Sequence, residues 1–307
     1  MRDGKLPLDR NFGGLSPLLP SPLSLSLSDQ VDAFTGEGLR GNPAAVCVLS
    51  CEADPMSMQR VATELNVSQT AFLVKNSSEE EISPFDYELR WFSPRCEVPL
   101  CGHGTLASAY YLFATKAVKG DLIRFNTKSG VLPARKIGTS SSESFQVELD
   151  FPVMTTSPCD NANFVLTETL GGASVVAVST SGRGDLIAKL SSEEHVRGLK
   201  PDFDEVLACS DFGLLVTAKA SAHSAYDFVS RFFAPRFAIN EDPVCGSAHC
   251  ALAPYWAKKL LKNTLSACQV SERGGKLDLQ VNWESMRVLM RGEAVINYGY
   301  KEYPLNI

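Results

Sequence analysis

Two copies of one short pattern, a cysteine followed by a glycine and then by a helix-forming run, stand about 140 residues apart in this chain. The first copy begins at Cys101-Gly102 and the second begins at Cys245-Gly246. Behind each copy, apolar residues follow the spacing of one helix face. They are Leu106, Ala109, Tyr110 and Phe113 behind the first copy, and Ala251, Leu252, Tyr255 and Trp256 behind the second. The pattern predicts two helices that each start beside a cysteine.

A helix start is a chemically distinctive place for a cysteine. The first backbone N–H groups of a helix have no partner within the helix, and together with the helix dipole they stabilise negative charge. A cysteine there tends to have a lowered pKa, so its nucleophilic and basic thiolate is available. The same N–H groups can hold a substrate carboxylate. Two such helix starts that face each other would form a site with an anion cradle and a thiol on each side.

Six short motifs occur in order along most of the chain. They cover residues 31–35, 41–46, 64–72, 101–105, 231–235 and 241–249. In this order they resemble the motifs of the PhzF-like (phenazine biosynthesis-like) proteins, which share the diaminopimelate epimerase fold. The resemblance implies two similar domains that wrap central helices, with the active site in the cleft between them. It also implies an isomerase that works without a cofactor, and family precedent implies a homodimer.

Composition excludes several classes of partner. The chain has 307 residues, which is more than one average domain, so two domains are expected. The formal net charge of -6 offers no basic surface to nucleic acid and no attraction to an anionic membrane. No apolar run reaches the roughly 18 to 20 residues that a membrane span needs. We therefore expect a small metabolite as the partner, and neither nucleic acid nor a membrane.

The cysteines and the N-terminal segment bear on the cellular setting. Nine cysteines, an odd number without C-x-x-C spacing, argue against a disulfide framework and against a structural zinc site. Free thiols indicate a reducing compartment, so we expect a cytoplasmic protein. We expect no metal, and the family resemblance implies that no cofactor is used. Residues 1–23 are rich in Pro, Gly, Leu and Ser and precede the first motif. We expect them to form a variable or disordered extension.

The order of the predicted elements indicates the fold class. In each half of the chain, several strand-like stretches precede one helix and a few follow it, unlike the alternating rhythm of a parallel sheet. We predict an α+β protein of two similar domains, each a curled, mostly antiparallel sheet around a central helix. The expected domains are residues 24–151 and 152–307, with the last residues packing back on the first domain. We also expect a linker over residues 152–166 and a loop over residues 240–247.

The two cysteines suit proton transfer at a carbon atom. A racemase or epimerase without a cofactor removes a proton from one face of a carbon and returns one to the other. It needs one deprotonated and one protonated group, and Cys101 and Cys245 can supply them. In epimerase and proline racemase relatives, the cysteines of the two Cys-Gly motifs have this role, which the resemblance implies here. The structural alternative is that either thiol is a small buried apolar side chain.

Gln69 departs from the family pattern. In PhzF-like isomerases this position carries a glutamate that acts as the acid and base, and a carboxyl group can carry a proton. A neutral amide cannot, although it still donates and accepts hydrogen bonds. The PhzF-type allylic proton shift therefore conflicts with this residue. Either the thiols have taken over the chemistry or the protein is inactive toward that class of substrate.

The remaining candidate residues surround the two helix starts. His103 can act as an acid or base or orient the substrate, because its pKa lies near neutrality, or it can cap the helix. Asp242 can orient His103 or cap the second helix. Asn42, in a Gly-Asn-Pro turn, is a substrate contact or a plain turn residue. Backbone N–H groups expected to face a carboxylate belong to Gly102, Gly104, Thr105, Gly246 and Ser247. Arg183, in a Gly-Arg-Gly turn, receives no role, since the turn is too short for a phosphate loop.

Three functions are consistent with these residues. The first is a racemase or epimerase acting on a small carboxylate substrate through Cys101 and Cys245. The second is a PhzF-type isomerase that moves a double bond and a proton with His103 and Asp242. The third is a non-catalytic small-molecule-binding protein. The cysteine pair favours the first, and Gln69 favours the third over the second.

Overall fold

The computed structural model describes residues 23–24, 26–76, 86–139, 144–159, 166–167, 169–237, 239–297 and 304–305. The expected N-terminal extension lies outside these residues, apart from its last position. Within the described part of the chain, no helix is both long enough and apolar enough to cross a membrane.

Helices are few compared with the strands in the described part of the chain. The helices are α1 (Pro55–Leu65), α2 (Gly102–Ala114), α4 (Glu193–Arg197), α5 (Phe203–Cys209), α6 (Gly246–Leu260) and the 3-10 helix η2 (Pro235–Phe237). The first strands are β1 (Leu23–Ser24), β2 (Ser26–Ala33), β3 (Asn42–Leu49), β4 (Gln69–Lys75), β5 (Asp86–Phe92), β6 (Glu97–Val98), β7 (Leu122–Thr127), β8 (Gly130–Gly138) and β9 (Phe145–Pro152). They are followed by β10 (Thr156–Pro158), β11 (Val175–Ser181), β12 (Leu186–Leu190), β13 (Leu214–Lys219), β14 (Phe228–Ala234), β15 (Ile239–Asp242), β16 (Thr264–Gln269), β17 (Gly275–Asn282), β18 (Arg287–Gly292), β19 (Ala294–Asn297) and β20 (Pro304–Leu305). Both helices predicted behind the cysteines are confirmed, since α2 and α6 begin at the two glycines.

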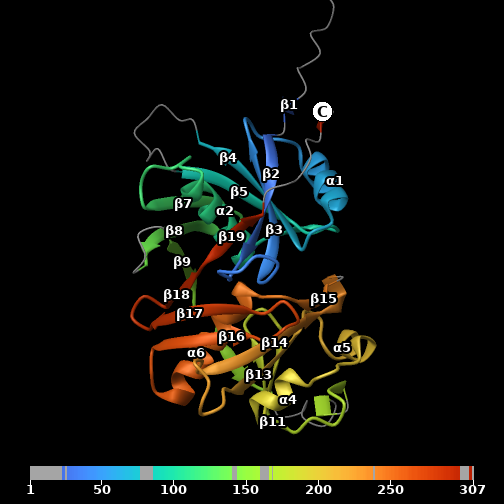
Figure 1. The fold of residues 1–307 in the computed structure, drawn as a ribbon. Helices are drawn as coiled ribbons and strands as arrows, with labels where there is room; N and C mark the ends of the chain where they lie inside the picture. Colours follow the sequence, from blue (N-terminus) through green and yellow to red (C-terminus); the bar gives the residue numbers. More distant parts are fainter. Residues whose placement is uncertain are drawn as a thin grey trace, which may run out of the picture.

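The described strands β2 to β19 form one continuous 18-stranded sheet. Figure 1 shows it as two stacked halves, an upper half around α2 and a lower half around α6. Most neighbouring strands are antiparallel, and parallel pairs such as β3–β4 and β12–β13 interrupt the pattern. This mixed sheet with few helices confirms the predicted α+β class.

Strand pairing joins the two halves at two places. Strand β9, late in the upper half, pairs with β18 of the lower half from Val147↔Gly292 to Pro152↔Arg287. The late strand β19 returns to the upper half and pairs with β2 through Ala294↔Ala33. These ladders fix the position of one half against the other.

Two expectations about irregular segments are wrong. The predicted linker over residues 152–166 contains β10, which pairs with β11. The predicted loop over residues 240–247 contains the end of β15, where Asp242 pairs with Phe232 of β14. Both short strands exist because a partner strand lies beside them, and local composition does not reveal a partner.

Helix α2 is buried because almost every position on it is apolar or small. Its buried residues include Leu106, Ala109 and Leu112, and it carries no charged side chain. A helix that is apolar on all sides belongs inside a protein. Helix α1 is different, since Met58, Val61 and Leu65 form one buried stripe on an otherwise more polar helix. Helix α2 is therefore the centre of the upper half, and α1 covers its outside.

The two central helices meet at their first residues. A Cβ atom built on Gly102 would lie 2.8 Å from the Cα of Gly246 and 3.3 Å from the backbone nitrogen of Ser247. A Cβ atom built on Gly246 would lie 3.0 Å from the Cα of Gly102. Real Cβ atoms essentially never approach backbone as closely as 2.8 Å, so only glycine fits at position 102.

Replacing Gly102 with alanine should destabilise the protein by about 2 kcal/mol, because the added methyl group must push the helix starts apart. Gly138→Ala is the matched control, since a Cβ atom there meets nothing within 4 Å. Urea denaturation of both variants measures the free energy of unfolding. Equal stability of the two variants would contradict the close approach.

Candidate active site

Each cysteine occupies the N-cap position of a central helix. Cys101 precedes α2, and its Sγ accepts a hydrogen bond from the Gly104 N–H over 3.3 Å. Cys245 precedes α6, and its Sγ lies 3.4 Å from Ser247 Oγ. Both cysteines are buried, with 6% of their surface exposed. The thiols are close enough that a charge on Cys245 raises the pKa of Cys101. The structure thus brings the two predicted residues together at the meeting point of the helices.

Asn42 at the start of β3 connects the two halves of the site. Its Nδ2 lies 3.1 Å from His103 Nδ1, 2.5 Å from Asp242 Oδ1 and 2.9 Å from the carbonyl oxygen of Val244. Its Oδ1 accepts a hydrogen bond from Ser68 Oγ over 2.7 Å. The amide is therefore fully used in positioning other residues, rather than free to contact a substrate.

The hydrogen-bond network assigns a tautomer to His103. The single hydroxyl hydrogen of Ser68 lies between two acceptors, Asn42 Oδ1 at 2.7 Å and the carbonyl oxygen of Pro43 at 2.6 Å, so Ser68 Oγ accepts from His103 Nε2 at 3.2 Å. Nδ1 then carries the lone pair, and it lies 3.5 Å from Cys101 Sγ. Burial lowers the pKa of His103 to about 3, so the ring is neutral near pH 7 and only weakly basic. His103 Nδ1 is thus placed to accept a hydrogen bond from the Cys101 thiol, which remains protonated.

Asp242 is the hydrogen-bond acceptor of the Cys245 thiol. Burial raises the pKa of this carboxyl to about 6, and hydrogen bonds from the Val244 N–H, the Cys245 thiol and Asn42 partly offset the effect of burial. Near neutral pH the carboxylate is ionised and accepts the hydrogen of the Cys245 thiol. Each thiol therefore has its own hydrogen-bond acceptor within the site.

The expectation that the helix starts lower the pKa of the thiols is wrong for this structure. Burial raises the pKa of Cys245 to about 12, and the Asp242 carboxylate raises it further, while Arg183 opposes both effects. Burial likewise raises the pKa of Cys101 well above its ordinary value, although the Gly104 N–H favours the thiolate. Removing the thiolate from water costs more free energy than the helix N–H groups return.

The helix starts retain a cradle for an anion, though a smaller one than expected. The Gly104 N–H bonds to Cys101 Sγ, and the Thr105 N–H bonds to the carbonyl oxygen of Cys101. Neither is free for a carboxylate, in contrast to the expectation. The N–H groups of Gly102, Gly246 and Ser247 have no hydrogen-bond partner among the described residues. Three free donors thus remain where the two helices meet.

Arg183, for which the sequence predicts no role, lies at the site. Its Nη1 donates to Ser247 Oγ over 3.0 Å, and its Nε and Nη2 pair with the buried carboxylate of Asp185. Its positive charge favours the thiolate of Cys245. A lone arginine in a hairpin turn carries no local signal of this contact, because the turn comes near Cys245 only through folding of the lower half.

Gln69 and Trp91 complete the site from strands β4 and β5. Both side chains are buried. Gln69 follows Ser68 directly, and Trp91 Nε1 would lie 3.2 Å from a Cβ atom on Gly104. Gln69 Oε1 and Trp91 Nε1 have no hydrogen-bond partner among the described residues. Sequence reasoning singled out Gln69 but missed Trp91, because strand alternation marks it only as a buried residue.

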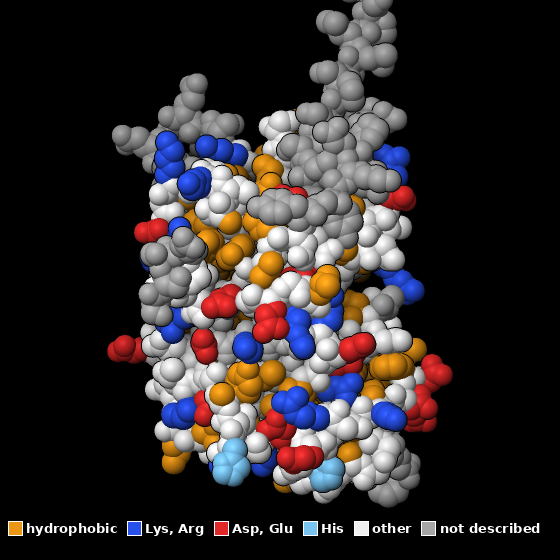
Figure 2. Space-filling model, viewed as in Figure 1, with side chains coloured by type: hydrophobic (Ala, Val, Ile, Leu, Met, Phe, Trp, Pro, Cys, Tyr) orange, Lys and Arg blue, Asp and Glu red, His pale blue; other side chains and the backbone are white. Residues whose placement is uncertain are grey.

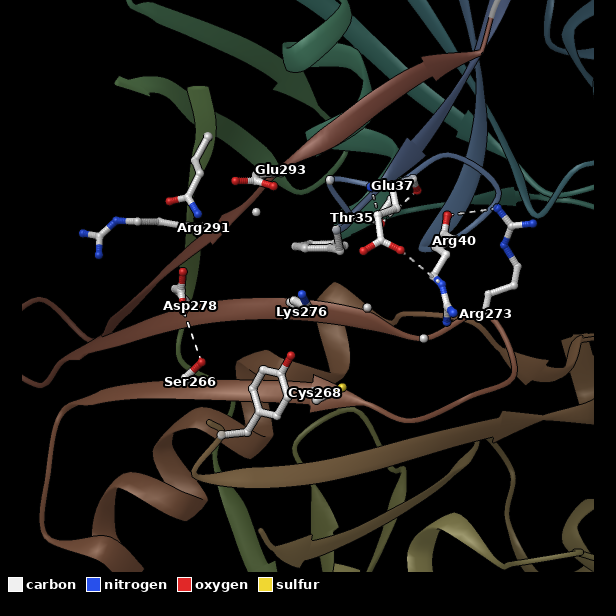
Figure 3. A pocket seen from close by; sticks show the side chains of 17 residues that line it. Thr35, Glu37, Arg40, Ser266, Cys268, Arg273, Lys276, Asp278, Arg291 and Glu293 are labelled. Atoms are coloured by element: carbon white, nitrogen blue, oxygen red, sulfur yellow. Dashed lines mark hydrogen bonds and ion pairs between the residues drawn. The ribbon is translucent and has the colours of Figure 1, made fainter. Parts of the chain in front are cut away.

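The predicted site residues lie away from a hollow between the two halves. This hollow has a volume of about 600 Å³ and is lined by charged side chains such as Arg40, Lys276 and Glu293 (Figure 3). None of the predicted site residues lines it. A hollow of about 470 Å³ is lined by Ser68 and by Pro243, the neighbour of Asp242, and so adjoins the network. Figure 2 shows basic and acidic side chains intermixed on the face that it displays.

No group of three or more His, Cys, Asp or Glu side chains among the described residues has a metal-binding arrangement.

Comparison with known proteins identifies the family. A model of the phenazine biosynthesis-like protein family matches residues 31–299. An uncharacterized isomerase of Halalkalibacterium halodurans is 41% identical over 269 residues, which cover 86% of this chain and 94% of that protein. A crystal structure of a PhzF-family protein from Enterococcus faecalis has a TM-score of 0.78 and 40% identity, and the match covers 88% of this chain and 96% of that chain. The chain therefore belongs to the phenazine biosynthesis-like (PhzF) family.

A more distant structure agrees with the fold. A probable proline racemase from Agrobacterium radiobacter superposes with a TM-score of 0.58 at 11% identity, over 88% of this chain and 90% of that chain. At this identity the likeness concerns the fold alone. It confirms the predicted class, in which PhzF proteins and epimerase-type proteins share an α+β architecture.

The raised thiol pKa values have a direct consequence for reactivity. In the folded protein near neutral pH, Cys101 and Cys245 should react with iodoacetamide at least about 100-fold more slowly than the exposed Cys51 and Cys96, because the thiolate is the reactive form. Mass spectrometry of tryptic peptides over a time course measures each rate. Rapid labelling of either buried thiol would show that the helix start outweighs burial.

Proposed function

We propose that this protein is a cofactor-independent isomerase that exchanges a proton at a carbon of a small carboxylate substrate, using Cys101 and Cys245. Membership of the PhzF family supports an isomerase, since relatives in the family carry that name. The observation that carries the finer proposal is geometric. The two thiols are the N-cap residues of two helices whose first glycines touch.

The helix starts would bind the carboxylate and stabilise the transition state. The free N–H groups of Gly102, Gly246 and Ser247 offer donors, and the positive ends of two helix dipoles converge on the same point. When the proton leaves the neighbouring carbon, negative charge develops on the carboxylate oxygens. Fixed donors in a buried place stabilise such charge more strongly than water does.

The thiols would move the proton between the two faces of the carbon. Cys101 acts as the thiolate, formed when its proton leaves to solvent, and it takes the proton from carbon. The neutral Cys245 thiol gives its proton to the opposite face and is left as the thiolate. In the reverse reaction the Cys245 thiolate takes the proton from carbon and the Cys101 thiol gives one to the first face. A thiolate whose pKa is raised by burial is a stronger base, which suits a weakly acidic C–H group.

Single replacement of either cysteine tests the proposal. Cys101→Ser and Cys245→Ser should each lower conversion of one substrate enantiomer into the other by about 1000-fold or more, because each face of the carbon needs its own thiol and a hydroxyl group is a far weaker acid than a thiol. Conversion is followed by chiral chromatography over a panel of enantiomerically pure 2-hydroxy and 2-amino acids in D₂O, with no added cofactor. The control is Cys51→Ser, which changes an exposed thiol. Conversion that survives in either site variant would exclude the two-thiol mechanism.

A PhzF-type shift of a double bond and a proton is the second candidate. The observation in its favour is the direct link of His103 and Asp242 through Asn42. These two groups could move a proton along a conjugated substrate without either thiol. This candidate reaction lacks the carboxyl group that it needs at position 69, where this chain has Gln69.

Gln69→Glu separates this candidate from the others. If the double-bond shift is the reaction, the variant should gain activity on a cyclic diene acid by about 100-fold or more, since it regains an acid and base group. Ultraviolet absorbance of the diene follows the reaction, and Gln69→Leu is the control. An inert Gln69→Glu variant counts against the double-bond shift. Absence of activity in every variant and in the parent protein would favour the non-catalytic binding function.

A further inference from the structure

Two buried polar atoms of the site lack a hydrogen-bond partner. They are Gln69 Oε1 and Trp91 Nε1. The only other buried side-chain nitrogen or oxygen atom without a partner in the described part of the chain is Thr70 Oγ1. Gln69 is 6% exposed and Trp91 is 1% exposed. Buried polar groups in native proteins nearly always have partners, so an unpartnered pair beside a candidate active site indicates a partner that arrives with the ligand.

Strand register places both side chains toward the start of α2. Trp91 of β5 pairs with Ala71 of β4, and Gln69 lies two residues before Ala71. Since side chains alternate along a strand, Gln69, Ala71 and Trp91 share one face of the sheet. Ala71 and Trp91 belong to the core cluster that surrounds α2. Thr70 points to the opposite face, so its hydroxyl has no part in the site.

Trp91 lies next to the thiol of Cys101. A Cβ atom on Gly104 would lie 2.8 Å from Trp91 Cδ1, 3.2 Å from Trp91 Nε1 and 3.1 Å from Cys101 Sγ. The indole N–H and the thiol therefore adjoin the same residue in the first turn of α2. A substrate carbon that Cys101 can reach would bring its substituents near Trp91.

The two unpartnered groups differ in what they require. An indole N–H can only donate, so its partner must be a hydrogen-bond acceptor. The unpartnered atom of Gln69 is Oε1, which can only accept, so its partner must be a hydrogen-bond donor. An ammonium group can only donate and would leave Trp91 Nε1 unpaired, and a carbonyl oxygen can only accept and would leave Gln69 Oε1 unpaired. A hydroxyl group, which both accepts and donates, satisfies both residues.

We propose that the substrate is a hydroxy acid, whose hydroxyl group accepts a hydrogen bond from Trp91 Nε1 and donates one to Gln69 Oε1. The inference rests on the proposed function, because it assumes that the carboxylate lies at the two helix starts. It also accounts for the neutral amide at position 69. A carboxylate there would attract an ammonium group, whereas an amide suits an uncharged oxygen.

The three tryptophans of the chain provide an internal control. Trp256 Nε1 already donates to Thr217 Oγ1 over 2.9 Å, and Trp283 Nε1 donates to Asn263 Oδ1 over 2.9 Å. In a ¹H–¹⁵N spectrum of the full chain, the three indole signals are resolved and are assigned by single Trp→Phe variants. Only the Trp91 signal reports a free N–H that a ligand can engage.

The experiment titrates the protein with acids that differ in one substituent. The probes are both enantiomers of lactate, malate, alanine and aspartate, with propionate and succinate as unsubstituted acids. Lactate or malate should move the Trp91 indole proton downfield and leave the other two signals in place. An equal shift with alanine or aspartate, or no shift with either hydroxy acid, would overturn the proposal.

A second variant measures the contribution of the indole N–H. Trp91→Phe should weaken binding of the hydroxy acid that shifts the signal by about tenfold and leave binding of the matching unsubstituted acid unchanged, which corresponds to one lost hydrogen bond. Trp283→Phe is the matched control. Equal weakening for both acids would mean that Trp91 only supports the fold. Because binding is read without turnover, hydroxy acid binding without conversion between enantiomers would reject the proposed isomerase and retain this inference.

Discussion

The contact between Gly102 and Gly246 is the constraint on which the site depends. It directs the N-terminal ends of α2 and α6 at each other, so the positive ends of two helix dipoles meet in a buried place. Like charges repel, and the arrangement persists because the β9–β18 and β19–β2 ladders hold the halves together. An anion between the helices would relieve the repulsion. A carboxylate would therefore be stabilised at the point where both thiols lie.

Burial gives the two thiols higher pKa values than those of most catalytic cysteines. A nucleophilic cysteine needs a low pKa, so that the thiolate is abundant at neutral pH. A cysteine that takes a proton from carbon needs basicity, and burial of Cys101 and Cys245 supplies it. The neutral forms of both thiols prevail at rest, which protects them from reagents in water. The two thiols differ in their surroundings, since Cys101 lies 3.5 Å from the neutral His103 ring and Cys245 donates a hydrogen bond to Asp242.

Local sequence was sufficient to predict the helices and the cysteines that precede them. The spacing of apolar residues and the Cys-Gly pairs specified both N-cap positions, and the order of elements specified the α+β class. The connecting residues could not be predicted in the same way. Asn42 bonds to Asp242 across 200 positions, and Arg183 reaches Ser247 across 64. Such contacts depend on how the halves stack, and burial, which reverses the expected thiol pKa shift, depends on the same packing.

The amide at position 69 agrees with chemistry based on thiols. Asp242 already raises the pKa of both cysteines. A glutamate at position 69 would place a further buried carboxyl group on the same face of the sheet as Trp91 and near His103. If ionised, it would raise the thiol pKa values further and repel the substrate carboxylate. If protonated, it would compete with the thiols as a proton donor. A neutral amide avoids both effects, so the proposed two-thiol mechanism favours glutamine over glutamate at position 69.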